Sequence, residues 1–589
     1  MLELLTDLMQ DAVGRCAYAE ARHVDARSEA LAVLNGRVDA IDSSGSEGIG
    51  VRVQVGGGWG FAATRDVTRV GARAALARAL AVAAAQPSSA DRALAPVAPA
   101  LGHWTSPYEL DPFAIALEDK LELLFAVEAA LRTGDERLVR TAASCGAWRE
   151  RKAFASTEGA ACTQETVATG AGILAYATDG SDLQVRSYPT AHGGGLSAAA
   201  GWEHVLALDL AGNAPRVAEE AVALLSAPQC PEGTSTIVLH GEQVALQVHE
   251  SIGHALELDR ILLGEASYAG TSWVAPDDLG SLRYGSELLH VTADATLPHG
   301  LGSFGWDDEG VAAVRADLVE GGVLRGALSN RESAAAVGLS ASGGCARADG
   351  FARQPIVRMT NVSLEPGTVP TLADLVADTD EGLYLESNRS WSIDDRRLQF
   401  QFATELCREI RGGELGRLYR NGSYAGVTPR FWGGLDAVCG PGEWRLWGAD
   451  QLRQGRARAD HGRLPRRRPR ALSRRAGRCG VTDLDPLELA ERALGFTDGE
   501  AQATVVRERS LLSRFAVSRP TQATEVDDLT LSILRVHEGH TGLAETNETT
   551  DEALRDVAGR ADAAARAAAG AAGEPGDYPG LPAPAPAPS

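Results

Sequence analysis

Two distant stretches of this chain carry the same pattern of strands and turns. The stretch from Ser28 to about Ala83 aligns without a gap with the stretch that begins at Ser510. Gly60-Phe61-Ala62-Ala63-Thr64 falls opposite Gly542-Leu543-Ala544-Glu545-Thr546, and each copy continues into an Ala-rich helix. Such internal similarity is typical of one supersecondary unit used twice. The chain is therefore predicted to contain two copies of one α/β module.

Hydrophobic periodicity predicts further elements around the first copy. The predicted helices are Leu4–Ala17, Arg69–Ala85, Pro112–Arg132 and Val217–Ser226. The predicted strands include Leu31–Leu34 and Ile49–Val55, with more short strands up to about residue 210. Residues 1–225 are thus expected to form an N-terminal α/β domain.

The composition changes after about residue 233. A short strand is predicted over Thr236–His240 and a helix over Val244–Leu258, and short strands alternate with turns across 286–447. We therefore expect an α+β fold in which residues 226–447 form a β-rich domain. Residues 448–480 are Arg- and Pro-rich without a hydrophobic period, residues 481–570 hold the second module in truncated form, and residues 571–589 are expected to be disordered.

The charge and the cysteine content exclude several classes of protein. The net charge of -23 argues against a general nucleic-acid binder. Binding of nucleic acid through the arginines of 463–478 is a weaker, separate alternative. No apolar run is long enough to span a membrane, and the acidic N-terminus does not resemble a signal peptide. Eight cysteines without a CxxC pair do not indicate a disulfide framework. A cytoplasmic protein with reduced thiols is expected.

The strongest chemical signal is His249-Glu250-Ser251-Ile252-Gly253-His254, which lies in the predicted helix 244–258. In a zinc-binding HExxH helix the two histidines are four residues apart and share one face. Here the spacing is five, which places His254 about 140° around an ideal helix from His249. A π-bulge absorbs one extra residue, and Gly253 is the residue best able to yield there. A widened turn is therefore predicted.

With such a turn, the segment has the parts of a hydrolytic zinc site. Zinc makes a water molecule acidic near neutral pH, and Glu250 would take its proton as the water attacks a peptide carbonyl. A helix that merely contains two histidines and a glutamate is the alternative, because short motifs often occur by chance.

Several segments extend this motif into a family resemblance. His249-Glu250-Ser251-Ile252-Gly253-His254-Ala255-Leu256-Glu257 resembles the HExxGHxxE element of the TldD/PmbA family of zinc metallopeptidases. The other segments that resemble TldD are Gly305–Gly310, Arg358–Asn361, Glu365–Gly367, Ser387–Asp395, Glu414–Gly416 and Leu418–Asn421. The resemblance covers about residues 1–447 and favours the TldD branch, because the PmbA (TldE) branch lacks the HExxxH element.

The resemblance implies a function and a set of site residues. It implies a zinc peptidase that acts on small or unfolded peptides inside a closed chamber, paired with a TldE/PmbA-like subunit as a heterodimer. His249 and His254 would bind Zn²⁺, Glu250 would be the general base, and Glu257 is a candidate for support outside the metal shell. Asp307, Asp308 and Glu309 are candidates for further site residues, but acids in a turn are more often solvated, and we favour that interpretation.

The third zinc ligand implied by the resemblance is a Cys in a C-terminal segment, and it is missing here. After Trp444-Arg445-Leu446-Trp447-Gly448 the chain reads Ala449-Asp450-Gln451-Leu452-Arg453. One possible GC-rich coding string for this stretch, read in a frame displaced by one base, gives Asn-Cys-Gly-Lys-Gly, which resembles the family segment. We therefore hypothesise a frameshift near Gly448 and a fusion to the first module of a TldE/PmbA-like partner, which residues 481–570 resemble.

Two alternatives follow from the missing cysteine. A natural fusion with a basic linker would explain the Arg-rich stretch without a frameshift. A catalytically impaired chamber subunit, which binds partner or peptide, would explain the loss of a ligand. Cys439 and Cys479 are the cysteines nearest to the lost position in sequence, and neither is assigned to zinc.

Overall fold

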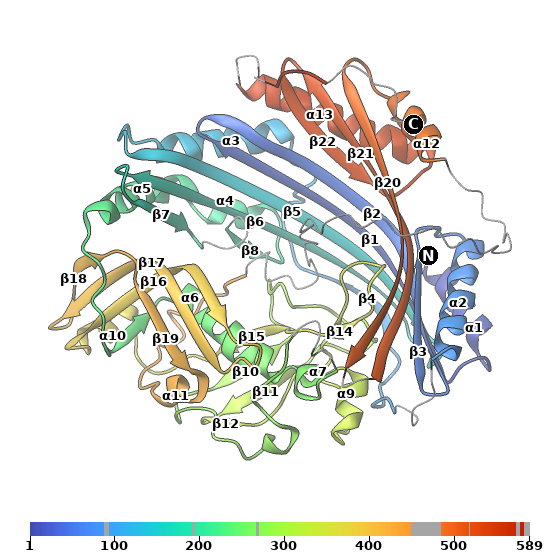
Figure 1. Ribbon diagram of the computed structural model, residues 1–589, viewed down its shortest axis with the longest axis horizontal. Coiled ribbons are helices and arrows are strands. Elements are labelled where there is room, and N and C mark those ends of the chain that lie inside the picture. Colours follow the sequence, from blue (N-terminus) through green and yellow to red (C-terminus); the bar gives the residue numbers. More distant parts are fainter. Residues whose placement is uncertain are drawn as a thin grey trace, which may run out of the picture.

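A computed structural model describes residues 1–86, 93–190, 195–264, 266, 270–448, 485–516, 519–572, 576 and 578–581. One large sheet of 11 strands arches over a second, β-rich region that carries the histidine motif (Figure 1). The α+β class predicted from the sequence is confirmed. Apart from Gly448, the predicted Arg/Pro-rich segment lies outside the described residues, as does most of the predicted tail.

The N-terminal module is a helix, three antiparallel strands and a helix. Its elements are α1 (Leu2–Ala12), β1 (Tyr18–Leu34), β2 (Arg37–Val55), β3 (Gly58–Thr64) and α2 (Arg69–Ala84). Helix α2 has nearly the predicted bounds and begins where the hydroxyl of Thr68 accepts a bond from the Gly71 N–H. Helix α1 ends five residues before the predicted Ala17, and Gly14 follows with a φ of 77°.

The strands of this module are much longer than predicted. Strand β1 has 17 residues, and its middle is polar. It pairs with β2 along one edge and with β5 along the other. Polar residues of these strands are buried against the second region; Glu20, Arg22 and Arg52 are examples. The polar residues in the middle of β1 (25–29) and of β2 (42–47) interrupt the apolar alternation that indicates a strand, so only the strand ends were predicted.

The central segment extends the same sheet and covers it with helices. Its elements are β4 (Leu101–Thr105), α3 (Leu117–Leu131), β5 (Leu138–Ser156), β6 (Ala161–Thr178), β7 (Leu183–Tyr188), β8 (Leu196–Ala198), α4 (Trp202–Ala207) and α5 (Leu210–Ser226). Apolar residues of α3 and α5 pack on β1, β5 and β6 and form the largest cluster of the core. The many short strands predicted here are mainly two long ones, β5 and β6.

The second region contains short strands, one longer hairpin and the motif helix. It begins with β9 (Ile237–Leu239), α6 (Gly241–Val248), a π-helical turn (His249–Gly253), a 3-10 turn (His254–Leu256) and α7 (Leu258–Ile261). A small sheet follows, made of β10 (Val291–Asp294), β11 (Arg315–Glu320), β12 (Val323–Leu324) and β15 (Asn361–Leu364). The predicted single helix over Val244–Leu258 is thus three consecutive helical segments.

The rest of this region builds a five-stranded sheet and short helices. That sheet contains β16 (Glu381–Ile393), β17 (Gln399–Arg411), β18 (Glu414–Tyr419) and β19 (Ser423–Val427), with β9 as an edge strand. The remaining elements are a 3-10 turn (Pro276–Asp278), β13 (Ala346–Arg347), β14 (Ile356–Val357), α9 (Arg331–Ala336), α10 (Leu372–Ala377) and α11 (Thr428–Gly433).

Residues 486–572 have the same order of elements as residues 2–84. They form α12 (Pro486–Leu494), β20 (Ala501–Ala516), β21 (Arg519–His537), β22 (His540–Thr546) and α13 (Asp551–Ala572). Figure 1 shows them in orange and red at the end of the arched sheet. Strands β20, β21 and β22 are consecutive antiparallel strands, as β1, β2 and β3 are.

The two modules join through parallel strand pairs with a local two-fold relation. Asp42 of β2 pairs with Leu543 of β22, and Thr524 of β21 pairs with Phe61 of β3. In the sequence repeat Asp42 aligns with Thr524 and Phe61 with Leu543, so both junctions join the same two positions. A self-complementary contact of this kind is the geometry of a two-fold dimer interface.

The described residues contain no helix that is long and apolar enough to cross a membrane.

Candidate metal centre

The motif helix is widened where the five-residue spacing predicts it. The N–H of His254 donates to the carbonyl of His249, five residues back, within the π-helical turn His249–Gly253. A Cβ on Gly253 would lie 2.0 Å from the Sδ of Met359, so the turn needs a glycine at this point. The five-residue spacing is thereby absorbed in a single turn.

Side chains from two other elements hold this turn. The Tyr284 hydroxyl donates to the Ser251 carbonyl at 2.6 Å, and the Trp432 indole N–H donates to the Ser251 hydroxyl at 3.0 Å. Ser251 and Tyr284 are fully buried. These bonds satisfy polar groups that a widened turn leaves exposed to the core.

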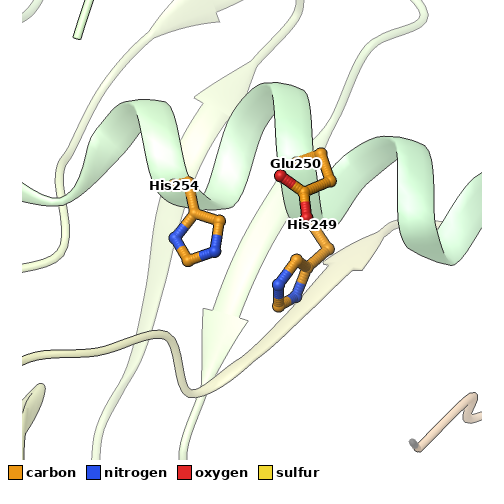
Figure 2. Close-up of side chains that lie close together, drawn as sticks. All are labelled: His249, Glu250 and His254. Carbon is orange, nitrogen blue, oxygen red and sulfur yellow. The ribbon is translucent and has the colours of Figure 1, made fainter. Parts of the chain in front are cut away.

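The widened turn brings the predicted ligands together. The imidazole rings of His249 and His254 have centroids 4.7 Å apart at an angle of 79°. One ring nitrogen of each histidine and one carboxylate oxygen of Glu250 lie within 4.8 Å of one another. Figure 2 shows the two rings side by side below the helix, with the Glu250 carboxylate beside them. Three donor atoms at such separations can reach one ion.

The electrostatics of the two histidines suit metal binding. Burial, together with the neighbouring His254, holds the pKa of His249 well below its usual range. Burial also lowers the pKa of His254, although Glu257 opposes the effect. Both rings are therefore neutral near pH 7, and only a neutral imidazole has a lone pair for a metal ion.

Glu257 lies against the second histidine. Its Oε2 is 3.1 Å from Nδ1 of His254, and Arg260 Nε donates to the same oxygen. Arg260 Nη2 is also 2.9 Å from Nδ1, so the tautomer decides which contact is a hydrogen bond. Burial raises the pKa of Glu257, but His254 and Arg260 outweigh it and hold the pKa well below its usual range. A carboxylate that accepts a hydrogen bond from Nδ1 favours the tautomer in which Nε2 carries the lone pair for a metal.

The structure adds Arg397, which the sequence analysis missed. Its Nη1 donates to Oε2 of Glu250 at 2.7 Å, and both side chains are largely buried. Arg397 lies in the turn between β16 and β17, 147 residues away in sequence. In the sequence, only its position two residues after the TldD-like segment Ser387–Asp395 could have marked Arg397 as a site residue. No spacing rule connects it with the motif.

A large cavity opens beside the motif. Its volume is about 2120 Å³, and His249 lies in its wall. The wall also contains His240, Cys439, Trp447, residues 231–239 and residues 359–366. A cavity of this size has room for several residues of a peptide.

The three consecutive acids are not in a solvated turn, so that interpretation was wrong. Asp307, Asp308 and Glu309 are all nearly fully buried, at the contact between the large sheet and the second region. Arg52 donates to Glu309 at 2.6 Å, and Lys152 donates to Asp308 at 3.2 Å. Buried cations from strands that are distant in sequence offset the cost of burying these carboxylates. A single sequence does not show which cations will lie next to them.

The acids serve the contact between the two regions rather than the metal. Asp307 accepts bonds from the N–H groups of Glu309, Val311 and Ala346. Burial and the nearby Glu309 raise the pKa of Asp307 well above its usual range. In the described part of the chain, the only cluster fit for a metal ion is His249, Glu250 and His254.

No cysteine joins that cluster among the described residues. Cys439 lies in the cavity wall, and burial raises the pKa of its thiol. With Glu250 expected to act as the base, the described chain would supply a metal ion with two imidazole ligands, where catalytic zinc usually has about three protein ligands. Cys479 and the segment expected to carry the missing ligand lie outside the described residues.

The widened turn lies beside a large cavity, and comparison with known proteins places the chain among metallopeptidases. Residues 19–86 match PmbA/TldA metallopeptidase domain 1, residues 110–227 match the central domain, and residues 232–456 match the C-terminal domain. A metalloprotease of Methanothermobacter thermautotrophicus is 30% identical over 436 residues, which cover 74% of this chain and 91% of that protein. The chain belongs to the PmbA/TldA metallopeptidase family.

Other relatives agree with this assignment. A zinc metalloprotease TldD homolog of Saccharolobus solfataricus is 28% identical over 197 residues, which cover 33% of this chain and 42% of that protein. The crystal structure of TldE from Thermococcus kodakarensis has the same fold, with a TM-score of 0.57 and 16% identity over 74% of this chain and 94% of that one. Family membership and the relatives' names support a metalloprotease.

Proposed function

We propose that this chain is a zinc metallopeptidase of the HExxxH type that hydrolyses flexible or unfolded peptides. The observation that carries the proposal is the convergence of His249, Glu250 and His254 in one widened turn. The two imidazoles suit zinc, which binds His nitrogen in catalytic sites.

The residues of this chain have separate roles in the proposed reaction. His249 and His254 hold the ion, and Glu257 orients His254 through Nδ1. When bound, zinc supplies Lewis acidity, which polarises the peptide carbonyl and makes water acidic near neutral pH. Glu250 takes the proton of the attacking water at its carboxylate and passes it to the leaving amine. Arg397 fixes one oxygen of Glu250, so the other is free for this transfer.

The cavity supports flexible peptides as substrates. His249 lines a cavity of about 2120 Å³, where a peptide segment fits and a folded domain does not. The side chains and edge strands around the cavity can bind the main chain of an extended peptide.

The experiment measures zinc and peptide hydrolysis on the same protein samples. The wild-type chain is expected to contain stoichiometric zinc and to cleave an unstructured peptide. Glu250→Gln should keep the zinc and lose at least a hundredfold in kcat, because only the proton transfer is removed. His254→Ala should lose both, while the exposed His103→Ala should lose neither. A Glu250→Gln protein with full activity would exclude the proposed mechanism.

The second candidate is a chamber subunit that binds partner or peptide without turnover. The observation that favours it is the absence of a cysteine from the metal cluster in the described part of the chain. Zinc-free wild-type protein that still binds the peptide would support it, whereas stoichiometric zinc with activity would exclude it.

The expected TldE/PmbA-like partner has a counterpart inside the chain. Residues 485–572 pair with the first module through the two-fold-like junction of β2, β3, β21 and β22. We propose that this truncated second module occupies, in the same chain, the place of a partner's first module. A heterodimer with a separate TldE/PmbA-like subunit would then require this module to leave.

The frameshift hypothesis has a direct test in the gene. Sequencing from codon 440 to codon 485 should show a reading frame, displaced by one base, that encodes Asn-Cys-Gly-Lys-Gly after Gly448. If neither displaced frame encodes it, residues 448–480 are a linker between naturally fused domains.

A further inference from the structure

Two of the cysteines lie against each other, far apart in sequence. The Sγ atoms of Cys230 and Cys407 are 3.8 Å apart, across 177 residues of chain. Both are free thiols, and no other pair of cysteines in the described part of the chain has such a contact. The pair is not part of the metal cluster at His249 and His254.

The two thiols differ in their access to solvent. Cys407 lies in β17 and is fully buried beneath Leu385 and Tyr419. Cys230 is half-buried in the segment that joins α5 to β9, where its N–H donates to the Arg420 carbonyl at 3.0 Å. A small oxidant in solution can therefore reach Cys230 first, with Cys407 directly behind it.

The contact also shifts the pKa values of the two thiols in opposite directions. Either sulfur can be the donor in this contact, and a hydrogen bond from the buried Cys407 S–H lowers the pKa of Cys230. The same hydrogen bond, together with burial, raises the pKa of Cys407. A lowered pKa favours the thiolate of Cys230, which is the nucleophilic form.

We propose that Cys230 and Cys407 form a reversible thiol–disulfide site that responds to hydroperoxides. Cys230 is the attacking sulfur and Cys407 is the resolving sulfur. An accessible thiol with a second thiol next to it is the arrangement of a redox-sensing cysteine pair.

The reaction balances with one hydroperoxide. The Cys230 thiolate attacks an oxygen of hydrogen peroxide; the O–O bond breaks, hydroxide leaves and takes up a proton, and Cys230 becomes a sulfenic acid. The sulfur of Cys407 then attacks the Cys230 sulfur; the S–O bond breaks, the Cys407 proton goes to the departing oxygen, and a second water leaves. The two sulfurs lose two electrons in total, and the peroxide gains them.

Oxidation would act on one wall of the cavity. A disulfide is about 2.05 Å long, so the sulfurs must approach from their present 3.8 Å. Residues 231–236 directly follow Cys230 and line the cavity. The bond would tie this wall to β17, and it would close a long loop of the unfolded chain, which stabilises the folded protein.

The experiment uses the full chain and does not depend on peptidase activity. The reduced protein is treated with hydrogen peroxide at pH 7, denatured in an alkylating agent and digested for mass spectrometry. The expected result is a linked pair of peptides containing Cys230 and Cys407, loss of two alkylatable thiols, an increase of several degrees in Tm, and reversal of all three by dithiothreitol.

Cysteine variants test whether the disulfide forms only between Cys230 and Cys407. Cys230→Ser and Cys407→Ala should each abolish the link and the Tm increase, and Cys439→Ser, which removes another thiol of the cavity wall, should keep both. Cys230→Ser leaves the buried core unchanged, so it serves as the test if Cys407→Ala does not fold. Conversion of Cys230 to a sulfinic acid while Cys407 remains alkylatable, or a link to another cysteine, would overturn the proposal.

Discussion

Arg397 donates a hydrogen bond to Glu250 over 2.7 Å and thereby fixes one oxygen of the proposed general base. The backbone of Arg397 has a φ of 62°, in a turn where the Thr428 hydroxyl donates to its carbonyl at 2.9 Å. A non-glycine residue in this conformation is strained and persists only where its surroundings hold it. The turn is thus built to present the guanidinium to Glu250.

Arg397→Gln should lower kcat by about tenfold or more, because a general base that is free to rotate is less often in position for proton transfer. Zinc content should not change, because the side-chain hydrogen bond described for Arg397 goes to Glu250 and not to either histidine. Steady-state kinetics with metal analysis on the same samples checks this. The exposed neighbour provides the control: Arg396→Gln should retain wild-type kcat. Equal activity of the two variants would contradict a positioning role.

Glu257→Gln should weaken zinc binding by about 10- to 100-fold, because the neutral amide no longer favours the Nδ1–H tautomer of His254. It should also lower the free energy of unfolding, since Arg260 is buried and loses its counter-ion. Competition with a zinc chelator measures the affinity. The matched control is Glu443→Gln, an exposed carboxylate of the same cavity wall. Unchanged zinc affinity would remove Glu257 from the metal site.

Arg52→Met should destabilise the chain by about 3–5 kcal/mol, because it leaves Glu20 and Glu309 buried without their shared cation. Removal of the exposed Arg73–Asp11 pair by Arg73→Met should cost less than about 1 kcal/mol. Denaturant unfolding of both variants gives the comparison. A small effect of Arg52→Met would mean that the two acids bind protons instead of requiring the arginine.

Glu405 gives a prediction for the dependence of stability on pH. Burial raises its pKa to about 7 from 4.5, although Arg186 and Ser187 oppose the effect. Between these two values the folded state binds a proton that the unfolded state does not, so this group's contribution to stability falls as pH rises. As the pH rises from 4.5 to 7, ionisation of Glu405 should lower the free energy of unfolding of the wild type by on the order of 3 kcal/mol. The Glu405→Gln variant should not show this decrease.

The measurement for Glu405 is the difference between two unfolding profiles. The free energy of unfolding of wild type minus that of Glu405→Gln should decline from pH 5 to pH 7 and stay flat above it. Glutamine keeps an acceptor for the Ser187 N–H and hydroxyl, so the fold should persist. A difference that is constant across the range would show that Glu405 titrates normally.

Cutting the chain between its two modules should not separate them. A protease site inserted within residues 449–484 allows cleavage of the purified protein, and both fragments should elute together in gel filtration. The junction is supported by Asn547, which bonds both backbone groups of Glu47 at 2.8 Å, and by Arg560, which donates to Ser43 at 2.6 Å. Asn547→Ala with Arg560→Ala should allow the fragments to separate. Separation of the wild-type fragments at micromolar concentration would contradict a partner-like junction.

The sequence predicted what depends on local spacing. The helix Arg69–Ala84 and the widened turn at His249–Gly253 both follow from the residues within them. The bond of Arg397 to Glu250 and the burial of Asp307–Glu309 depend on residues that are distant in sequence, and no local pattern encodes such contacts. The full length of the strands was missed for a related reason: the polar middle of β1 is held by pairing with β2 and β5, which are strands from other parts of the sequence.

The short strand pairs between β2 and β22 and between β3 and β21 have a consequence for stoichiometry. Three and four residue pairs make a small contact, which between separate chains would form only at sufficient protein concentration. Within one chain, pairing is a first-order event with an effective concentration in the millimolar range. The two modules are therefore always supplied one to one, whatever the level of expression, and dilution does not dissociate them.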